Sequence, residues 1–499
     1  MKIAFVVYGA ENLGIEYLSS ALCQKGHQVK QIFEPGLFSE SNPILKGIFS
    51  QKKKIIAEIQ KFKPQLIGFS VVTSTYQWAC QLAQEIKQVS DIPIIFGGYH
   101  ASAAPEQVLS NACVDLLCIG EGEEAICELV NSMEQGKLSR QIRNIWFKDK
   151  SGIIRNPLRP LISDLDQLAF PDKSIYQDVP LIYSKYMVMA SRGCPFSCTF
   201  CGNSFLHELY PSSGQAIRRR SVENVLTELK EAKVKYRYKK VLFVDDAFGQ
   251  NRQWTREFLK KYKQEINVPF FCNPHVLYLD QELICLLKDA GCFLMQTGVE
   301  TVAEGYRKEI LHRPETNAHI EFVLGACKKI GLKVQVDHMF GLPLQGEKEQ
   351  QLAAEFYNRT RPDSIACFRF TYYPGTKMIE LAKAKGWLTE DEIQSIQEGR
   401  VADYGDHRSD ILGRKYQGSS LMYKNFLVLF KLLPLLPQGV IRWIIAKRFY
   451  KFFSIVPYNS IDLLRMVSML KKHDHLFFAY YKYFFYQVIK RLFLKSKPL

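Results

Sequence analysis

The first 140 positions alternate between two hydrophobic patterns. Short runs of apolar residues, typical of buried strands, are followed by stretches in which apolar residues return every three or four positions, as on one face of a helix. We expect strands at Ile3 to Tyr8, Leu66 to Val72, Ile92 to Phe96 and Val114 to Ile119, and helices at Leu13 to Cys23, Tyr76 to Ile86 and Ala125 to Met133. This alternation predicts a doubly wound, Rossmann-like parallel sheet over residues 1–140.

The alternation stops at residues 141–180, where four prolines predict a linker, and it resumes at residue 181. Strands are expected at Tyr186 to Ala190, Val241 to Val244, Pro269 to Cys272, Phe293 to Val299, Lys333 to Phe340 and Ile365 to Thr371. Helices are expected between them at Ser221 to Lys233, Arg252 to Gln264, Asp280 to Ala290, Asn317 to Ile330 and Glu347 to Asn358. Six such repeats predict a partial (β/α)6 barrel over residues 181–400, with chemistry at the carboxyl ends of the strands.

Residues 401–499 form a third region, which is aromatic, basic and helical. The stretch from Phe426 to Ala446 is long enough to cross a bilayer, but two lysine or arginine residues and two prolines interrupt it, which argues against spanning. The last helix carries a stripe at Phe477, Phe478, Tyr481, Phe484, Phe485, Val488, Ile489 and Leu492. Such a stripe fits an interfacial anchor and equally fits packing onto the barrel.

Charge sharpens the picture of this C-terminal region. Of the net charge of +16, residues 411–499 carry 16 lysine and arginine residues against two aspartates, and also 19 aromatic residues. The first 410 residues are nearly neutral. A basic, aromatic and continuously apolar face fits an anionic membrane surface better than nucleic acid, which favours polar, flexible basic segments.

The cysteines and the N-terminus bear on the compartment. The chain has 499 residues, enough for two or three domains, and 13 cysteines. Its first residues run directly into a predicted strand without the features of a signal peptide. We therefore expect the protein to lie in a reducing cytosol. The basic, aromatic C-terminal region adds the expectation of a peripheral position on the inner face of the membrane.

The strongest chemical signal follows the first predicted barrel strand. Cys194, Cys198 and Cys201 have C-x3-C-x2-C spacing on one loop and can hold three irons of a [4Fe–4S] cluster. The fourth iron is then left without a cysteine. Structural zinc needs four closed ligands and is disfavoured, because no second cysteine pair has a comparable spacing.

This pattern, with Phe200 before the third cysteine, resembles the radical S-adenosylmethionine (SAM) superfamily. The resemblance implies that the methionine part of SAM chelates the unique iron, and that an electron donor such as flavodoxin or ferredoxin reduces the cluster. It also implies SAM contacts from strand ends, which we assign to Asp245 or Asp246, Glu300 and Gly341. Two positions depart from the family's pattern: the paired aspartates replace a commoner Gly-Gly-Glu, and the fifth strand has Asp337 and Leu344 in place of the usual spaced glycine and acid.

The N-terminal sheet places glycines and small polar residues where its strands end, which is where ligands of such sheets bind. No G-x-G-x-x-G follows the first strand, so a dinucleotide is poorly supported. The segment resembles the cobalamin-binding domain of one branch of the superfamily, and the implied contacts are Asn12, Ser70, Gly97, Gly98, Gly120 and Glu121. The D-x-H-x-x-G motif of many cobalamin domains is absent, and His100 is a weak candidate for an axial ligand.

The resemblance implies a radical SAM enzyme in which the reduced cluster splits SAM into methionine and a 5′-deoxyadenosyl radical, and cobalamin methylates an unactivated carbon. The C-terminal region favours a hydrophobic, lipid-like substrate. A ring-forming or oxidative enzyme and a cobalamin or cluster sensor without turnover remain alternatives. An RNA methylthiotransferase is disfavoured, because Cys23, Cys80 and Cys113 lack the loop placement for a second cluster. No catalytic side chain or substrate pocket is assigned, and Arg218 to Arg220 fits an anion site or a solvated basic turn.

Overall fold

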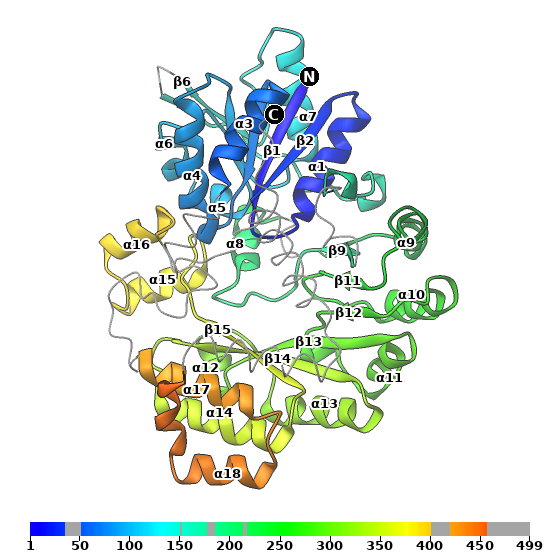
Figure 1. The fold of residues 1–499 in the computed structure, drawn as a ribbon, viewed down its shortest axis with the longest axis vertical. Coiled ribbons are helices and arrows are strands. Elements are labelled where there is room, and N and C mark those ends of the chain that lie inside the picture. The colour runs from blue at the N-terminus through cyan, green and yellow to red at the C-terminus, as the bar shows by residue number, and fades with distance from the viewer. Residues whose placement is uncertain (35–50, 150–151, 177–184, 213–216, 401–419, 457–499) are drawn as a thin grey trace, which may run out of the picture. The chain divides into compact units, whose positions relative to one another are not determined.

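A computed structural model describes residues 1–34, 51–149, 152–176, 185–212, 217–400 and 420–456 (Figure 1). The chain divides into two compact units. The first contains residues 1–177, 193–220 and 371–414, and the second contains residues 178–192, 221–370 and 415–499. These compact units divide the chain differently from the predicted segments 1–140, 141–180, 181–400 and 401–499, because the cysteine loop and the segment after the last barrel strand group with the first unit.

The first unit is built on a seven-stranded sheet in the order β2-β1-β3-β4-β5-β6-β7. Its strands are β1 (Lys2–Tyr8), β2 (Gln28–Glu34), β3 (Leu66–Ser70), β4 (Ile94–Gly97), β5 (Leu116–Cys118), β6 (Ile145–Asp149) and β7 (Gly152–Ile154). The first five run parallel, and β6 and β7 extend the sheet antiparallel. The predicted linker at 141–180 is corrected in this respect, since its first part continues the sheet.

Alternating side chains on β1 explain why both faces of this sheet are covered. Ala4 and Val6 pack on one face with the helices α3, α4, α5 and α6, while Ile3, Phe5 and Val7 pack on the other with α1 and α7. These helices are α1 (Leu13–Gln24), α3 (Lys52–Phe62), α4 (Thr73–Lys87), α5 (Tyr99–Ala103), α6 (Pro105–Ser110) and α7 (Glu123–Glu134). The predicted doubly wound fold is confirmed.

The rest of the first unit is formed by shorter elements, which are η1 (Leu165–Gln167), η2 (Lys173–Tyr176), α8 (Gly202–Leu209), β10 (Arg218–Arg219), α15 (Lys377–Ala384) and α16 (Glu390–Gln397). Segments far apart in the sequence thus complete one unit.

The second unit contains six parallel strands in the order β15-β14-β13-β12-β11-β8. They are β8 (Tyr186–Val188), β11 (Val241–Phe243), β12 (Phe270–Cys272), β13 (Cys292–Glu300), β14 (Lys333–Phe340) and β15 (Ser364–Arg369), with the short β9 (Ser191–Arg192) after β8. The spatial order follows the chain order, as a barrel wall built from successive βα units requires. The predicted partial (β/α)6 barrel is confirmed.

Crossover helices cover one face of this sheet, and side-chain caps mark where several of them begin. Ser221 accepts a hydrogen bond from the Asn224 amide, and Asp280 does the same for Leu283. The helices are α9 (Val222–Tyr236), α10 (Arg252–Glu265), η4 (Val276–Tyr278), α11 (Gln281–Asp289), α12 (Glu304–Glu309), α13 (Asn317–Ile330) and α14 (Glu347–Thr360).

Three C-terminal elements join the core of the second unit: α17 (Ser420–Leu432), α18 (Gln438–Ala446) and η5 (Phe449–Ile455). Phe430 of α17 is buried, with its ring 5.0 Å from His338 and 5.7 Å from Phe340. Residues of α17 therefore pack on the barrel, an arrangement that the sequence analysis considered only for the last helix. The stripe from Phe477 to Leu492 lies outside the described residues, within which no helix is long and apolar enough to cross a membrane.

Candidate active site

The three cysteines lie on a loop that begins after β9 and ends at α8. Cys198 is buried, while Cys194 and Cys201 are partly exposed. Cys201 immediately precedes the first turn of α8, and its amide donates to the Cys198 carbonyl over 3.1 Å. Because a helix N-terminus carries partial positive charge, this position stabilises a thiolate.

Contacts from distant parts of the first unit hold this loop in place. The His207 Nε2 atom lies 2.8 Å from the Cys194 carbonyl oxygen, and the Met378 amide donates to the Thr199 carbonyl over 2.8 Å. Tyr99 donates its hydroxyl to the Pro374 carbonyl over 2.8 Å. The loop is thus braced by α8 and by the turn at Pro374.

Gly202 leaves room for one of these braces. A Cβ atom at Gly202 would lie 2.6 Å from the Tyr99 ring, so only glycine allows the ring to approach the loop so closely. Phe200, the aromatic residue before the third cysteine, is partly buried on the same loop.

The donor chemistry fits a cluster that binds each cysteine at a different iron. All three donors are soft sulfurs on one short, braced loop. Within the described residues, no three histidine, cysteine, aspartate or glutamate side chains are grouped so as to enclose a single metal ion. None of the 13 cysteines forms a disulfide.

The predicted cobalamin contacts gather at one edge of the sheet in the first unit. The strand order reverses between β1 and β3, and ligands of doubly wound sheets bind at this point, beyond the carboxyl ends. Asn12 follows β1 and caps α1 by accepting from the Ile15 amide, while Ser70 ends β3. Gly97 ends β4, and Gly120 and Glu121 follow β5.

Close approach of the backbone explains the glycine at position 98. Gly98 has φ of +91°, and a Cβ atom there would lie 2.8 Å from the Val71 carbonyl oxygen. The turn after β4 is thereby pressed against the end of β3. A large cofactor can then approach backbone atoms along this edge, so the residues present fit a cobalamin.

Two of the predicted contacts are engaged within the protein. A Cβ atom at Gly120 would lie 1.9 Å from the Tyr210 hydroxyl, so this tyrosine, which no sequence signal marked, lies against the turn. Glu121 forms an ion pair of 2.8 Å with Arg218 and accepts from the Ile162 amide over 2.9 Å. The Glu121 carboxylate is therefore engaged by the chain itself.

The basic run at Arg218 to Arg220 is not a solvated turn. Arg218 holds the carboxylate of Glu121, and Arg220 is buried with its guanidinium over the Phe170 ring. The anion that Arg218 binds is therefore a carboxylate of the chain itself.

A buried ion triad lies beside the β1–α1 loop, and the sequence analysis missed it. Lys173 of η2 lies 2.6 Å from Glu11 and 2.5 Å from Glu16, and all three side chains are almost fully buried. Burial raises the pKa of Glu16 well above its usual range, and the Lys173 ammonium opposes this rise. Tyr176 accepts a hydrogen bond from the Asn12 amide over 2.7 Å, so η2 holds the β1–α1 loop in place.

His100 is buried within the first unit. Its Nδ1 atom lies 3.1 Å from the Thr73 hydroxyl, and its ring packs on Tyr76 with centroids 4.3 Å apart. Burial lowers its pKa to about 4. These contacts belong to a packed core histidine.

The strand ends of the second unit carry the predicted SAM contacts. Asp245 is buried, and its carboxylate accepts from the Ser191 hydroxyl over 2.5 Å and from the Ala190 amide over 3.2 Å. Burial raises its pKa to about 6. Asp245 therefore joins the ends of β8 and β11, and the neighbouring Asp246 is exposed.

Glu300 ends β13 in a left-handed conformation, with φ of +61°. Its carboxylate is buried and lies 3.4 Å from Arg313, while burial raises its pKa. A Cβ atom at Gly298 would lie 2.2 Å from the Glu300 carboxylate, so that glycine lets the side chain fold back over the strand. Strain of this kind in a non-glycine residue is common at functional sites.

Gly341 follows β14 with φ of +79°, and no atom lies within 4 Å of the place where a Cβ would stand. The backbone at this strand end is open to approach, as the assignment to adenine requires.

The face of this sheet opposite the helices carries a polar pair among apolar side chains. Gln296 donates to both carboxylate oxygens of Asp337, over 2.8 and 2.9 Å. Burial raises the pKa of Asp337 to about 7. Strand alternation puts Leu294, Met339 and Phe368 on the same face, since their neighbours pack against the helices.

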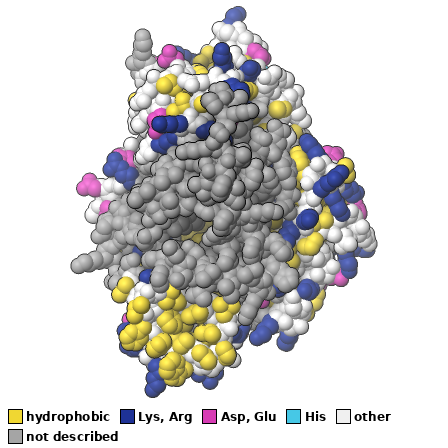
Figure 2. All heavy atoms as spheres, in the orientation of Figure 1, with side chains coloured by type: hydrophobic (Ala, Val, Ile, Leu, Met, Phe, Trp, Pro, Cys, Tyr) yellow, Lys and Arg dark blue, Asp and Glu magenta, His cyan; other side chains and the backbone are white. Residues whose placement is uncertain are grey.

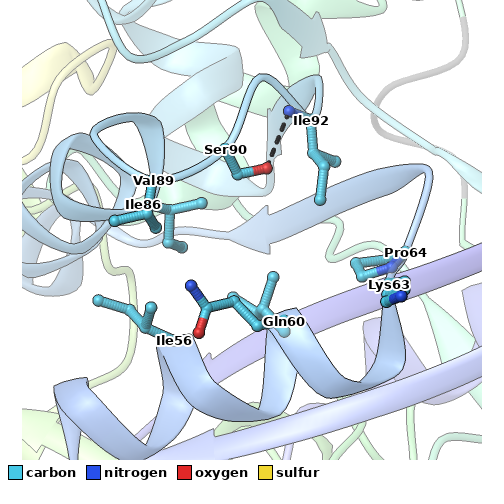
Figure 3. A pocket seen from close by; sticks show the side chains of 9 residues that line it. Ile56, Gln60, Lys63, Pro64, Ile86, Val89, Ser90 and Ile92 are labelled. Carbon is cyan, nitrogen blue, oxygen red and sulfur yellow. Dashed lines mark hydrogen bonds between the residues drawn. The ribbon is translucent and has the colours of Figure 1, made fainter.

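A pocket of about 330 Å³ lies elsewhere in the first unit, between α3 and α4 (Figure 3). Pro64 and Ile92 line it just before β3 and β4 begin. It is therefore at the amino edge of the sheet, away from the predicted cofactor contacts.

Two known protein families match different parts of the chain. Residues 3–130 match the B12 binding domain and residues 188–356 match the Radical SAM superfamily. The class that fold and site define is thus the radical SAM enzymes. Within that class, the chain belongs to the cobalamin-dependent proteins, whose cofactors are a [4Fe–4S] cluster, SAM and cobalamin.

Curated relatives span most of the chain. An uncharacterised methyltransferase of Pyrococcus horikoshii is 29% identical, over 75% of this chain and 79% of the relative. Cytidylyl-2-hydroxyethylphosphonate methyltransferase of Streptomyces wedmorensis is 21% identical, over 76% and 79%. Anaerobic magnesium-protoporphyrin IX monomethyl ester cyclase of Rubrivivax gelatinosus is 23% identical, over 65% and 59%.

Solved structures share the fold. The cobalamin-dependent SAM radical enzyme OxsB, with aqua-cobalamin and SAM bound, has a TM-score of 0.65 and 15% identity, over 98% of this chain and 80% of that one. The methyltransferase TsrM of Kitasatospora setae, with cobalamin and a [4Fe–4S] cluster bound, has a TM-score of 0.60 and 16% identity, over 77% and 75%.

Proposed function

We propose that this enzyme transfers a methyl group to an unactivated carbon of a hydrophobic, lipid-like substrate. The observation that carries the proposal is the presence in one chain of a braced three-cysteine loop and a cobalamin-binding sheet. Two of the curated relatives described above are methyltransferases. When bound, the cluster and SAM supply a hydrogen-abstracting radical, and cobalamin supplies the methyl group.

The chain's own residues bind and position these groups. Cys194, Cys198 and Cys201 hold three irons and leave one for SAM. Of the aspartate pair, the exposed Asp246 is the better candidate for the SAM ammonium, because both oxygens of Asp245 are engaged at the strand ends. Glu300 and Gly341 are the proposed ribose and adenine contacts.

The hydrophobic substrate is supported by side chains of the second unit. Leu294, Met339 and Phe368 offer apolar surface on the sheet face away from the helices, with Gln296 and Asp337 as a polar pair among them. A face of this kind suits an apolar molecule with one polar group to orient it. We propose a reducing cytosol as the compartment, with an electron donor such as flavodoxin or ferredoxin.

The decisive experiment uses anaerobically reconstituted protein with SAM labelled in its methyl group, dithionite and lipid extract. We expect 5′-deoxyadenosine and label in an extracted lipid. Formation of 5′-deoxyadenosine with an unlabelled but altered lipid would indicate the ring-forming or oxidative alternative, which the cyclase relative favours. Absence of 5′-deoxyadenosine under all conditions would favour a sensor.

Replacing one cluster ligand gives a sharper test. We expect Cys198→Ala to lower bound iron from about four atoms per chain to below about one, and to abolish 5′-deoxyadenosine formation, because a cluster needs its thiolates. The matched control is Cys285→Ala, which changes an exposed cysteine on α11. Equal iron contents in the two variants, measured by ferrozine assay, would contradict the ligand assignment.

A further inference from the structure

The surface of α18 and η5 has a composition that core packing does not require. Ile441, Ile444 and Ile445 of α18 are buried, which accounts for one side of the helix. On its other side Trp443 is 53% exposed, and Phe452 of η5 is 61% exposed. These large apolar side chains face solvent although burial of the isoleucines already anchors the helix.

We define the Trp443 patch as the exposed apolar residues of this region together with the exposed cations beside them. The apolar members are Val440, Trp443, Phe449, Phe452 and Ile455, and the cations are Arg442, Lys447, Arg448 and Lys451. Figure 2 shows hydrophobic side chains gathered at the foot of the view, where Figure 1 places α18, with lysine and arginine at their border.

Ring contacts make the aromatic part of the patch continuous. The Phe449 ring centroid lies 5.6 Å from that of Trp443 and 5.6 Å from that of Phe452. The rings therefore support one another across α18 and η5 and form one apolar surface.

The charge of this region has one sign. Residues 420–456 contain six lysine and arginine residues and no aspartate or glutamate. The bordering acid is Glu347 of α14, which lies 3.2 Å from Lys451 and accepts from the Tyr450 hydroxyl over 2.7 Å. The patch thus offers cations to a partner without offering it carboxylates of its own segment.

We propose that the Trp443 patch docks the enzyme on an anionic lipid surface. Exposed tryptophan and phenylalanine enter the headgroup boundary, and lysine and arginine bind anionic headgroups. A protein partner fits less well, because four cations without a carboxylate of their own segment surround the rings, whereas charged residues are depleted at the core of protein–protein interfaces. The proposal rests on the described residues 438–456 and is independent of the chemistry proposed for the active site.

Flotation of the full chain with vesicles tests this docking. We expect binding to vesicles of phosphatidylcholine and phosphatidylglycerol at about 3:1, and weaker binding to phosphatidylcholine alone. The double variant Trp443→Ser, Phe452→Ser should lower the partition coefficient at least about tenfold, since it removes apolar area that enters the boundary. Lys447→Gln, Arg448→Gln should lower it about 25-fold, because each cation near an anionic surface contributes about a fivefold factor.

The matched control is Phe322→Ser on α13, which removes a 47% exposed aromatic residue outside the patch and should leave partitioning unchanged. Retained binding of the Trp443 and Phe452 double variant would overturn the proposal. So would sedimentation equilibrium showing a dimer of the unchanged chain that this variant converts to a monomer, because the face would then bind a second copy. The assay needs no turnover, so its failure leaves the methyl-transfer proposal standing.

Discussion

At the scale of single residues, the structure shows that some carboxylates predicted to contact cofactors are engaged by the chain itself. Asp245 and Glu121 were both predicted as cofactor contacts, yet each is engaged by the chain's own donors. Asp246, next to Asp245, is exposed. A polar residue at a strand end therefore needs its partners identified before it is assigned to a ligand.

Asp245 also predicts a pH dependence of stability. Its folded-state pKa of about 6 lies above the ordinary value of 3.8, because burial disfavours its charged form. Between these two values the folded chain therefore binds more protons than the unfolded chain. The contribution of Asp245 to the free energy of unfolding is consequently lost as the pH rises from about 4 to about 6. Between pH about 4 and about 6, we expect the free energy of unfolding of Asp245→Asn to rise by about 3 kcal/mol relative to that of the unchanged protein. The difference between the thermal midpoints of the two proteins measures this change.

Asp91→Asn is the control for this measurement, since it neutralises an exposed aspartate of the first unit and should follow the unchanged protein. The same pH profile in the Asp245→Asn variant as in the unchanged protein would mean that Asp245 is ionised throughout.

At the scale of elements, turns that press one strand end against another shape the cofactor edge. Gly98 shows this most clearly, because its positive φ and the closeness of Val71 both exclude a side chain.

We expect Gly98→Ala to destabilise the first unit by about 2 to 4 kcal/mol and to release cobalamin, since the turn must move to relieve the contact. Gly26→Ala provides the control, because its φ is +84° but no atom lies within 4 Å of the added Cβ. Cobalamin retained after gel filtration in Gly98→Ala, as in Gly26→Ala, would show that this turn does not contribute to the cofactor site.

The elements themselves were largely predictable, because local patterns determine them. The helix at Asn317 to Ile330 and the strand at Lys333 to Phe340 agree with the structure to the residue, since Thr316 caps the helix and Gly331 ends it. The strands β6 and β7 were missed, because the prolines around them dominate the pattern of residues 141–180.

The site was less predictable, because its contacts join residues far apart in the chain. Lys173 lies 162 positions from Glu11, and Arg218 lies 97 positions from Glu121. Neither pair shares a periodicity or a motif. The cysteines were found because all three ligands lie within eight residues of one loop.

At the scale of the whole molecule, the C-terminal region has two roles within the described residues. Its α17 helix completes the core of the second unit, while α18 and η5 add an exposed aromatic surface. Aromatic content alone could not distinguish these roles.

We expect Phe430→Ala to destabilise the second unit by about 3 to 5 kcal/mol, because it empties a fully buried ring site against His338 and Phe340. Urea unfolding followed by circular dichroism measures this loss. Leu421→Ala, on the same helix but 57% exposed, should cost less than about 1 kcal/mol. Similar midpoints for the two variants would show that α17 is not part of the core.

The brace on the cysteine loop has a consequence for synthesis on the ribosome. The Thr199 carbonyl receives its hydrogen bond from Met378, and Tyr99 reaches the Pro374 carbonyl, so the loop is secured only after the polypeptide has grown well beyond its cysteines. A nascent chain arrested before residue 371 would carry all three thiols on a loop that α8 holds but the Pro374 turn does not yet hold. We therefore expect the loop to hold a cluster most stably once this late segment has been translated.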